Sequence, residues 1–140
     1  MSDFFDLKKT NIMVEFRIIG NDFEPSMVTD NLAISPSEYW IKGEAIKGRD
    51  TSRTYTCWAL STGYMESLDI NEPLDMILEK LSNKCNELLL LKKSFDINYK
   101  IDVTINIEEG QAPAVCLKSH VIEFAHLVCA EFDFDLYVYS

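Results

Sequence analysis

No stretch of this sequence approaches the run of about 20 apolar residues that an α-helix needs to span a bilayer. The beginning of the chain, MSDFFDLKKT, also contains no apolar run of the length found in a signal peptide. These two absences argue against a membrane or exported protein and predict a cytoplasmic one. A chain of 140 residues, 47% of them hydrophobic, can bury a core of its own, so we expect residues 1–140 to form a single domain.

Basic residues are scarce relative to acidic ones. Lys and Arg number 13 against 23 Asp and Glu, which gives a formal net charge of -10. Nucleic acids and anionic lipid surfaces are bound by clustered Lys and Arg, so this balance argues against both as partners. A negative field would instead speed the approach of a basic protein, although the same acidity also keeps a protein soluble without any role in binding.

Motifs for nucleophilic catalysis and for phosphate binding are missing as well. The sequence contains no G-x-S-x-G elbow, and its two histidines do not stand in a recognisable nucleophile context. It contains no glycine-rich phosphate loop, since Gly20 is followed by residues that include an acid and would repel a phosphate. Lys47, Arg49 and Arg53 would suit an anion, but a solvated loop is the commoner outcome. We therefore predict no catalytic residue and no cofactor.

Residues of the types that bind zinc occur near the end of the chain, at Cys116, His120, His126 and Cys129. Structural zinc sites usually join two close pairs of ligands from separate turns. On a helix over 119–130, His120 and His126 point about 120° apart, so they do not easily share an ion. His126 and Cys129 could share one, but no second pair stands near them in the sequence, and we predict no metal site.

Cysteine is present at four widely spaced positions among apolar neighbours. In a chain expected to stay in a reducing compartment, such thiols behave as small hydrophobic side chains. We therefore expect all four to be buried, reduced and slow to alkylate. The four are Cys57, Cys85, Cys116 and Cys129.

Alternation of apolar and polar residues marks the strands. It is clearest over 99–107, where the odd-numbered residues are apolar and Asp102, Thr104 and Asn106 are polar. The same reasoning predicts that 38–46 and 54–60 form a hairpin, with Trp40 and Trp58 as core residues. Strands are predicted at 12–20, 38–46, 54–60, 99–107, 114–118 and 131–139.

Apolar residues at three- and four-residue spacing mark the helices. The strongest signal lies between Pro73 and Lys92, a short helix follows Pro25, and Ser119 begins the last one. The predicted order is β-α-β-β-α-β-β-α-β. Because strands and helices each have a single apolar face, we expect the helices to cover one side of a largely antiparallel sheet, which is an α+β fold.

The last ten residues, EFDFDLYVYS, present three acids on one side of a strand and three large apolar groups on the other. We expect Phe132, Phe134 and Leu136 in the core, so that truncating Phe134 to Ala costs about 3–5 kcal/mol. The acids lie on the polar face of the sheet, with Asp102 from the strand at 99–107. Our candidate partner-binding residues are Asp102, Glu131, Asp133 and Asp135.

Carboxylates on alternate strand residues lie roughly 7 Å apart, a separation that also suits acid/base catalysis on a glycoside. Any exposed strand with acids at alternate positions has the same spacing, however. Nothing in the sequence supplies the aromatic-lined cleft that a sugar would need. A solvated sheet face therefore explains these acids better than a catalytic pair.

Several stretches, taken together, resemble a family of small bacterial proteins catalogued as domain of unknown function 4279. They are FRIIGNDFEP at 16–25, LAISP ending at Pro36, TCWAL around Trp58 and AVCLKSHVIEFAHLVCAEFDFDLYVY at 114–139. The resemblance covers about residues 12–139. It implies a compact α+β domain and assigns no catalytic residue. Members of the family look like accessory proteins found beside secreted toxin genes, so the resemblance suggests an immunity role.

The sequence is therefore compatible with three functions of different classes. The first is a non-catalytic protein-binding module, such as an immunity protein that masks a basic toxin, for example a nuclease, with an acidic sheet face. The second is an enzyme that acts on a small molecule in a pocket the sequence does not display. The third is a self-associating domain without another partner.

Overall fold

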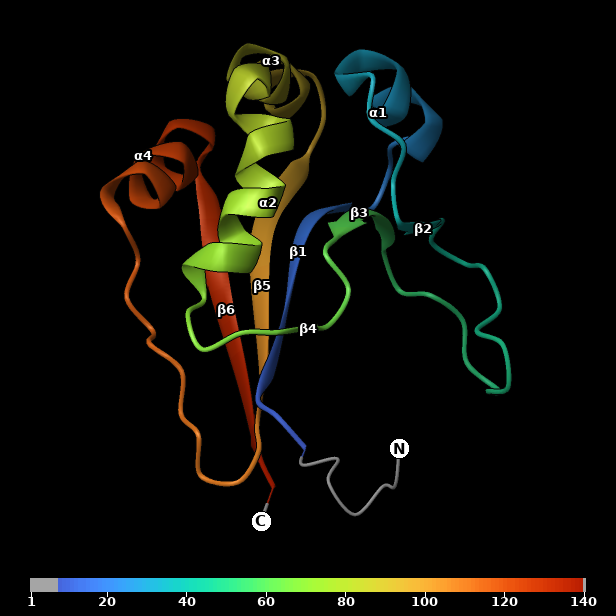
Figure 1. Ribbon diagram of the computed structural model, residues 1–140. Coiled ribbons are helices and arrows are strands. Elements are labelled where there is room, and N and C mark those ends of the chain that lie inside the picture. Colours follow the sequence, from blue (N-terminus) through green and yellow to red (C-terminus); the bar gives the residue numbers. More distant parts are fainter. Residues whose placement is uncertain (1–7, 140) are drawn as a thin grey trace.

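The computed structural model describes residues 8–139 (Figure 1). It consists of helices and a 6-stranded sheet, mostly antiparallel, which confirms the expected α+β class. The elements in chain order are β1 (Asn11–Gly20), α1 (Pro25–Leu32), β2 (Glu38–Trp40), β3 (Thr56–Ser61), β4 (Met65–Glu66), α2 (Asn71–Leu81), the 3-10 turn η2 (Ser82–Lys84), α3 (Cys85–Ser94), β5 (Ile97–Ile107), α4 (Ser119–Val128) and β6 (Ala130–Val138).

The observed order of elements differs from the predicted one in three places. A short strand, β4, pairs with the beginning of β1 and was not expected. The helix expected from Pro73 to Lys92 is two helices, because the 3-10 turn η2 interrupts it. The strand expected at 114–118 is absent among the described residues: Ala114 makes only an isolated bridge to Asp69.

The side chain of Asn71 explains why 114–118 is not a strand. Its amide nitrogen donates to the carbonyl oxygen of Cys116 at 2.6 Å, and its amide oxygen accepts from the backbone N–H of Lys118 at 3.4 Å. The backbone groups of this segment are therefore bonded by the first residue of α2 rather than by a neighbouring strand. This contact also holds the segment beside the helix layer.

The strands are ordered β2-β3-β1-β5-β6 across the sheet. The predicted hairpin is confirmed, since β2 pairs antiparallel with β3. However, β2 is three residues long rather than nine, because beyond Trp40 the chain leaves the sheet as a loop over 41–55. Two backbone hydrogen bonds close that loop: the N–H of Gly43 donates to the carbonyl oxygen of Arg53, and the N–H of Arg53 donates to that of Glu44. The last pair, β5 with β6, is parallel and is connected through α4.

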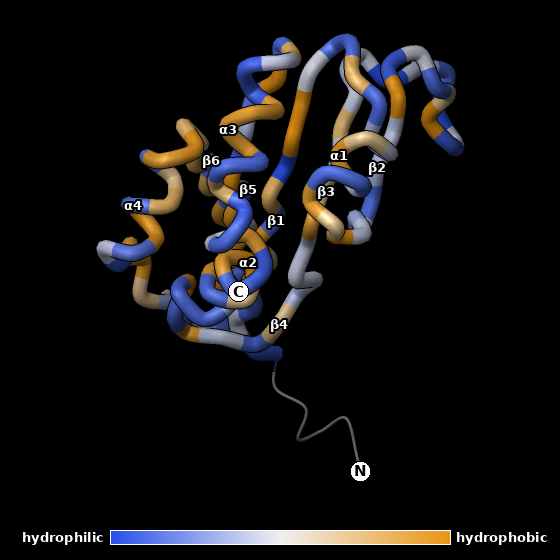
Figure 2. The backbone as a smooth tube through the Cα atoms, turned by 90° about the horizontal axis from the view of Figure 1, so that it is seen from above, coloured by the Kyte–Doolittle hydropathy of each residue, from blue (hydrophilic) through white to orange (hydrophobic). Residues whose placement is uncertain are grey.

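The helices cover one face of the sheet, where α2 crosses in front of β5 in Figure 1. Side chains of β1 and β5 alternate in burial, so every second residue points into the layer between sheet and helices. Phe16 at the centre of β1 contacts the rings of Tyr99 and Phe124 at 5.5 and 6.3 Å between centroids. Figure 2 shows hydrophobic and hydrophilic segments alternating along the helices.

The predicted core side chains of β5 are confirmed, because Ile101, Val103 and Ile105 are fully buried. The prediction for β6 was wrong in part. Phe132 packs against the core, but Phe134 is 37% exposed and Leu136 is 55% exposed. The reason is that β6 is the last strand of the sheet, so its apolar side faces the helix layer without a further strand beside it.

The expectation that all cysteines are buried was also wrong in part. Cys57 is buried and Cys85 is half-buried, whereas Cys116 and Cys129 are exposed. Cys116 lies in the surface segment that Asn71 holds. Cys129 ends α4 in a left-handed conformation, with φ of 59°, at the point where the chain turns outward to enter β6. Apolar neighbours in the sequence therefore did not predict burial at either position.

Candidate functional site

The face of the sheet opposite the helices carries the polar residues of β1, β5 and β6, and we call it the open sheet face. The strand register places Lys100 opposite Glu131, Asp102 opposite Asp133, and Thr104 opposite Asp135. All four candidate partner-binding residues therefore lie on one face. The acids of β6 are exposed, and Asp102 in the neighbouring strand is half-buried.

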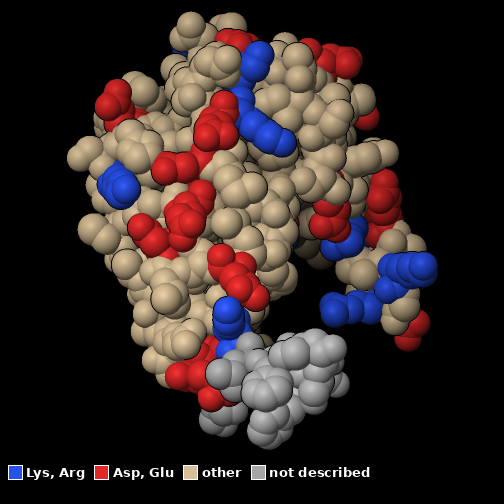
Figure 3. Space-filling model, viewed as in Figure 1, with Lys and Arg blue, Asp and Glu red and all other residues tan. Residues whose placement is uncertain are grey.

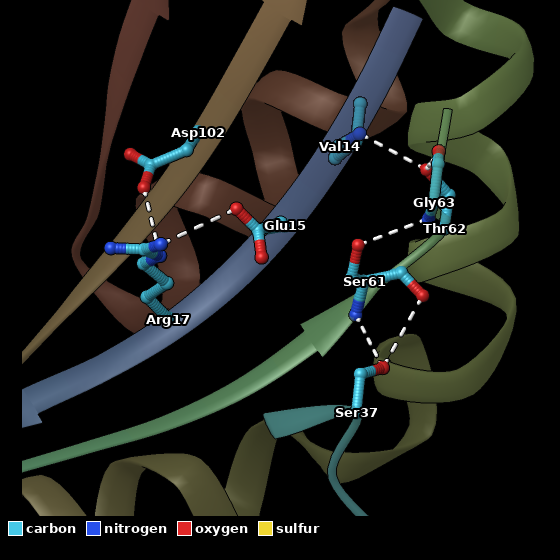
Figure 4. Close-up of polar contacts among 8 residues, drawn as sticks. All are labelled: Val14, Glu15, Arg17, Ser37, Ser61, Thr62, Gly63 and Asp102. Carbon is cyan, nitrogen blue, oxygen red and sulfur yellow. Dashed lines mark hydrogen bonds and ion pairs between the residues drawn. The ribbon is translucent and has the colours of Figure 1, made fainter. Parts of the chain in front are cut away.

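Arg17 on β1 occupies the centre of this face and was not among the sequence candidates. Its Nε lies 3.2 Å from Oδ2 of Asp102, and its Nη2 lies 3.4 Å from Oε1 of Glu15. Figure 4 shows the guanidinium reaching across from β1 to the carboxylate of β5. The side chains of Arg17, Glu15 and Asp102 are 26%, 12% and 18% exposed, so the three groups are largely removed from water.

The pKa values of this cluster follow from its burial and charge. Burial alone would lower the pKa of Arg17, but its neighbours, Glu15 foremost and Asp102 among them, together outweigh burial and the pKa is raised. Burial raises the pKa of Asp102, and Arg17 only partly reverses the effect, while Asp133 and Glu15 raise the pKa further. Asp102 therefore lies in an environment in which additional positive charge would stabilise its ionised form.

The remaining acids of the open sheet face are only partly neutralised. Lys100 Nζ lies 3.1 Å from Oδ2 of Asp133, and this hydrogen bond raises the pKa of Lys100. Both groups are exposed, and such surface pairs contribute little to stability. Within residues 8–139, Glu131 and Asp135 have no ion-pair partner. The face consequently keeps an excess of negative charge.

A groove crosses the open sheet face beside these acids, with a cavity volume of about 510 Å³. Carboxylates of Glu15, Asp102 and Asp135 line it together with Arg17. Three tyrosines also line it, and each is about half exposed: Tyr64 at 56%, Tyr137 at 51% and Tyr139 at 47%. Exposed tyrosines offer a large ring surface and a hydroxyl at small conformational cost, which is why they are frequent in protein interfaces.

The chain fixes Tyr64 through a set of hydrogen bonds in the turn that precedes it. Thr62 Oγ1 accepts from the backbone N–H of Val14 at 3.0 Å, and the N–H of Gly63 donates to Ser61 Oγ at 3.0 Å (Figure 4). Gly63 has φ of 70°, a conformation that other residues adopt rarely. The turn is thus tied to β1, and Tyr64 is held over the groove rather than left on a free loop.

The sequence pattern alone indicates the position of two of these tyrosines. Tyr137 and Tyr139 continue the odd-numbered positions of Glu131, Asp133 and Asp135, so strand alternation places them on the acidic face. Tyr64 carries no such signal, because it reaches the groove from the connection between β3 and β4.

Acidic side chains are not confined to the open sheet face. Figure 3 views the helix side and shows many red carboxylates there, while the loop at 41–55 carries a group of blue basic side chains at the right. Exposed acids of the helix layer include Glu72, Glu79 and Glu123. Charge alone therefore does not select a face, and the groove with its tyrosines is what distinguishes the open sheet face.

The basic residues Lys47, Arg49 and Arg53 lie on the loop at 41–55, as the sequence predicted. Arg53 places its guanidinium carbon 3.9 Å from the ring centroid of Trp40, so its charge stacks on an aromatic face. Trp40 itself is 5% exposed, which confirms its assignment as a buried residue. It packs in a small cluster with Cys57 and Ala59 on the open side of the sheet.

Trp58 belongs to the main core, also as expected. It is fully buried, and its indole N–H donates to Thr29 Oγ1 at 3.1 Å. The two tryptophans therefore lie on opposite faces of the sheet, even though their strands are paired.

Among the described residues, no three His, Cys, Asp or Glu side chains lie close enough together to hold a metal ion. His120 Nε2 instead lies 2.6 Å from Oδ1 of Asp75 on α2, and both groups are exposed. His126 and the thiols of Cys116 and Cys129 are exposed as well.

A second cavity, of about 370 Å³, lies between α1 and β2 on the other side of the sheet. Its lining includes Pro25, Pro36, Tyr39 and Ile41, and it contains no histidine, cysteine or lysine. The side chains available for proton transfer there are the carboxylates and the tyrosine hydroxyl. This cavity is the place where the alternative of a small-molecule enzyme would have to be sought.

None of the helices within residues 8–139 is long and apolar enough to cross a membrane. A family model with the description "Domain of unknown function (DUF4279)" matches residues 8–139, which is nearly the whole chain. No curated protein and no solved structure matches the chain.

Proposed function

This chain belongs to the DUF4279 family, and from its surface we propose that it is a non-catalytic protein-binding module that holds a basic protein against the open sheet face. The observation that supports the proposal most is the groove in which Asp102 and Asp135 lie beside three half-exposed tyrosines. Acids attract a cationic surface, and tyrosines supply the apolar contact that charge alone does not provide.

The chemistry of the groove suits a lysine or arginine side chain from the partner. An ammonium or guanidinium group can lie over a tyrosine ring while it pairs with a carboxylate. Burial and the neighbouring acids raise the pKa of Asp102, and Arg17 offsets this effect only in part. A cationic side chain from the partner would therefore stabilise the ionised form of Asp102. Glu131 and Asp135, which have no ion-pair partner among the described residues, would strengthen the attraction.

The specific form of the proposal is an immunity protein that neutralises a basic toxin such as a nuclease. Proteins that bind nucleic acid carry clustered Lys and Arg that contact phosphates, and an acidic face can cover such a cluster. The proposal places the module in the cytoplasm, where its free cysteines would remain reduced.

The alternative function is that of a small-molecule enzyme, and the cavity between α1 and β2 is the feature that favours it. In that case ligand binding would perturb residues of that cavity and leave the open sheet face unchanged. The location of the functional surface therefore separates the two readings.

Capture from a lysate of the native host tests the proposal. Three immobilised proteins are compared: the wild type; a face variant with Glu131→Lys, Asp133→Lys and Asp135→Lys; and a control with Glu72→Lys, Glu79→Lys and Glu123→Lys. Both variants change the net charge by the same amount, but only the first changes the open sheet face.

We expect a basic protein to be retained by the wild type and by the control and to be lost by the face variant. Retention of the same protein by all three would assign binding to another surface. An acidic protein retained by the wild type would contradict the electrostatic basis of the proposal.

A further inference from the structure

The two edges of the sheet differ greatly in length. One edge is β2, with 3 residues, and the other is β6, with 9. Within residues 8–139, β6 pairs only with β5, so its outer side has no neighbouring strand. A long exposed edge strand presents unpaired N–H and C=O groups and is a ready site for the addition of another strand.

One hydrogen bond fixes which backbone groups point outward from β6. The N–H of Tyr139 donates to the carbonyl oxygen of Ile107 at 2.9 Å, so Tyr139 directs its backbone toward β5. Along a strand, successive residues direct their N–H and C=O groups to opposite sides. The even-numbered residues of β6 therefore direct theirs to the open edge.

The same even-numbered residues carry exposed apolar side chains. Phe134 is 37% exposed, Leu136 is 55% exposed and Val138 is 75% exposed, all on the helix side of the sheet. A strand that adds to this edge would satisfy the outward backbone groups and cover part of these side chains. The outward backbone groups and the exposed apolar side chains of β6 therefore both favour the addition of a strand at this edge.

Charge along β6 is divided between its two halves. The acids Glu131, Asp133 and Asp135 occupy the first half, whereas residues 136–139 are Leu-Tyr-Val-Tyr. Directly opposed like charges destabilise a strand pair. A second copy of β6 therefore fits only if the charged half of each strand meets the uncharged half of the other, which requires an antiparallel arrangement.

The register follows from this requirement. An antiparallel pair centred on Phe134 would oppose Asp133 to Asp135 of the second copy, and one centred on Asp135 would oppose that residue to itself. A pair centred on Leu136 opposes Asp135 to Tyr137 and Asp133 to Tyr139, with no carboxylates face to face. It also pairs Leu136 with Leu136 and Phe134 with Val138, so the exposed apolar side chains of the two copies meet.

We propose that this chain forms a two-fold symmetric dimer in which β6 pairs antiparallel with β6 of a second copy, centred on Leu136. The same surface patch serves both copies, as closed two-fold assembly requires. The two helix layers lie on the same side of the joined sheet, and the two open sheet faces become one continuous acidic surface. The inference goes beyond the proposed function and does not depend on it.

Sedimentation analysis tests the dimer against the chain mass of 16.1 kDa. We expect the wild type to show twice this mass. Leu136→Lys places two ammonium groups beside the two-fold axis and should return the mass to that of one chain, about a two-fold fall. The matched control is Leu90→Lys, where the side chain is 62% exposed on helix α3 rather than on the strand edge, and it should remain dimeric.

The salt dependence separates this inference from the proposed function. Each copy carries a net charge of -10, so the copies repel one another and the dimer should become tighter as salt is added. Association with a basic protein should weaken under the same change. A monomer at every protein and salt concentration would overturn the dimer and leave the binding proposal intact.

Cysteine cross-linking tests the register in a background with Cys116→Ser and Cys129→Ser, since both thiols are exposed. Opposed residues in a hydrogen-bonded antiparallel pair have Cα atoms about 5.5 Å apart, within the reach of a disulfide. Leu136→Cys should therefore cross-link to itself under mild oxidation.

Phe134→Cys is the control, because its two copies would lie four residues apart along the strands, about 14 Å. It should cross-link only when mixed with Val138→Cys. Efficient cross-linking of Phe134→Cys with itself, or none by Leu136→Cys in a protein that circular dichroism shows to be folded, would overturn the register.

Discussion

Replacing Arg17 by Met removes the guanidinium group that lies within ion-pair distance of both Glu15 and Asp102. Among residues 8–139, no other cationic side chain pairs with both acids. Met fills a similar volume without charge, so the packing beneath the guanidinium changes little. The two carboxylates would then face each other across β1 and β5 in a largely buried setting. We expect this variant to be less stable than the wild type.

The size of the loss follows from the exposure of the three side chains. Breaking a fully buried ion pair by removing one partner costs about 3–5 kcal/mol, and exposed pairs contribute about 0–1 kcal/mol. Arg17 is 26% exposed and its partners are 12% and 18% exposed, so the cluster lies between these limits. We expect a loss of about 2 kcal/mol in the free energy of unfolding at neutral pH, discounted for solvent screening.

The loss should depend on pH in a defined direction. The pKa of Asp102 is already raised in the folded protein above its ordinary value of 3.8. Such a group contributes stability that is present in full below its unfolded pKa and is lost as pH rises through the folded pKa. Without Arg17 the folded pKa rises further, so the deficit should be small below pH 3.8 and should grow toward neutral pH.

Urea unfolding of wild type and Arg17→Met at pH values on both sides of 3.8 provides the measurement. Lys100→Met is the matched control, since Lys100 forms the exposed pair with Asp133 and its loss should leave stability nearly unchanged. A deficit for Arg17→Met that stays constant across pH would refute the electrostatic explanation. A deficit equal to that of the control would show that the cluster is effectively exposed.

Two further predictions concern the core and the thiols. In denaturant titrations, Phe16→Ala at a fully buried position should lower the free energy of unfolding by about 3–5 kcal/mol. Phe134→Ala should lower it by about 1 kcal/mol, because the ring of Phe134 is 37% exposed. Equal losses for the two variants would mean that Phe134 on β6 is covered. Alkylation followed by mass spectrometry should label Cys116 and Cys129 rapidly and Cys57 very slowly, because burial raises the pKa of Cys57 to about 12. Rapid labelling of Cys57 in the folded protein would place it at the surface.

The central strands could be predicted because each is buried on one side only, which produces an alternation of apolar and polar residues in the sequence. Val14 and Phe16 in β1, and Ile101 and Val103 in β5, are buried on one side, and both strands are covered by helices. Period-two alternation is a direct consequence of such one-sided burial. The α+β class follows from the same residues.

The end of β6 could not be predicted in the same way. Alternation told us that Phe134 and Leu136 lie on the apolar side of the strand, which the register confirms. It did not tell us how much of that side is covered, because coverage depends on the position of the strand in the sheet. An edge strand can therefore have the same alternation of apolar and polar residues as a central strand while its apolar side chains are less buried.

The division of the helix at 73–92 and the missing strand at 114–118 have similar causes. Leu81 lies before η2 and Leu88 after it, and both are buried. The apolar spacing therefore continues through the 3-10 turn and does not indicate that α2 and α3 are separate helices. The segment 114–118 has the composition of a strand, but its backbone partners belong to Asn71, which lies 45 residues from Cys116. Local patterns do not contain such long-range contacts.

Of the four acids predicted as candidates, Asp102 and Asp135 line the groove, whereas Glu131 and Asp133 are not among its lining residues. Strand alternation is enough to place Glu15 and Arg17 on the same side of β1, but the pairing of Arg17 with Asp102 depends on the register between β1 and β5. Tyr64 reaches the groove through the turn that Thr62 fixes against β1. Both features arise from strand pairing, which a single sequence does not specify.

The association rate with the captured basic protein tests the central claim most directly. It is measured for three proteins at low and at physiological salt: the wild type, the variant with Lys at positions 131, 133 and 135, and the control with Lys at 72, 79 and 123. The binding proposal predicts that the wild-type rate falls as the Debye length shortens to about 10 Å and below, and that the face variant is slower than the control at low salt. Equal rates for the two variants, or a wild-type rate that does not change with salt, would contradict the assignment of binding to the open sheet face.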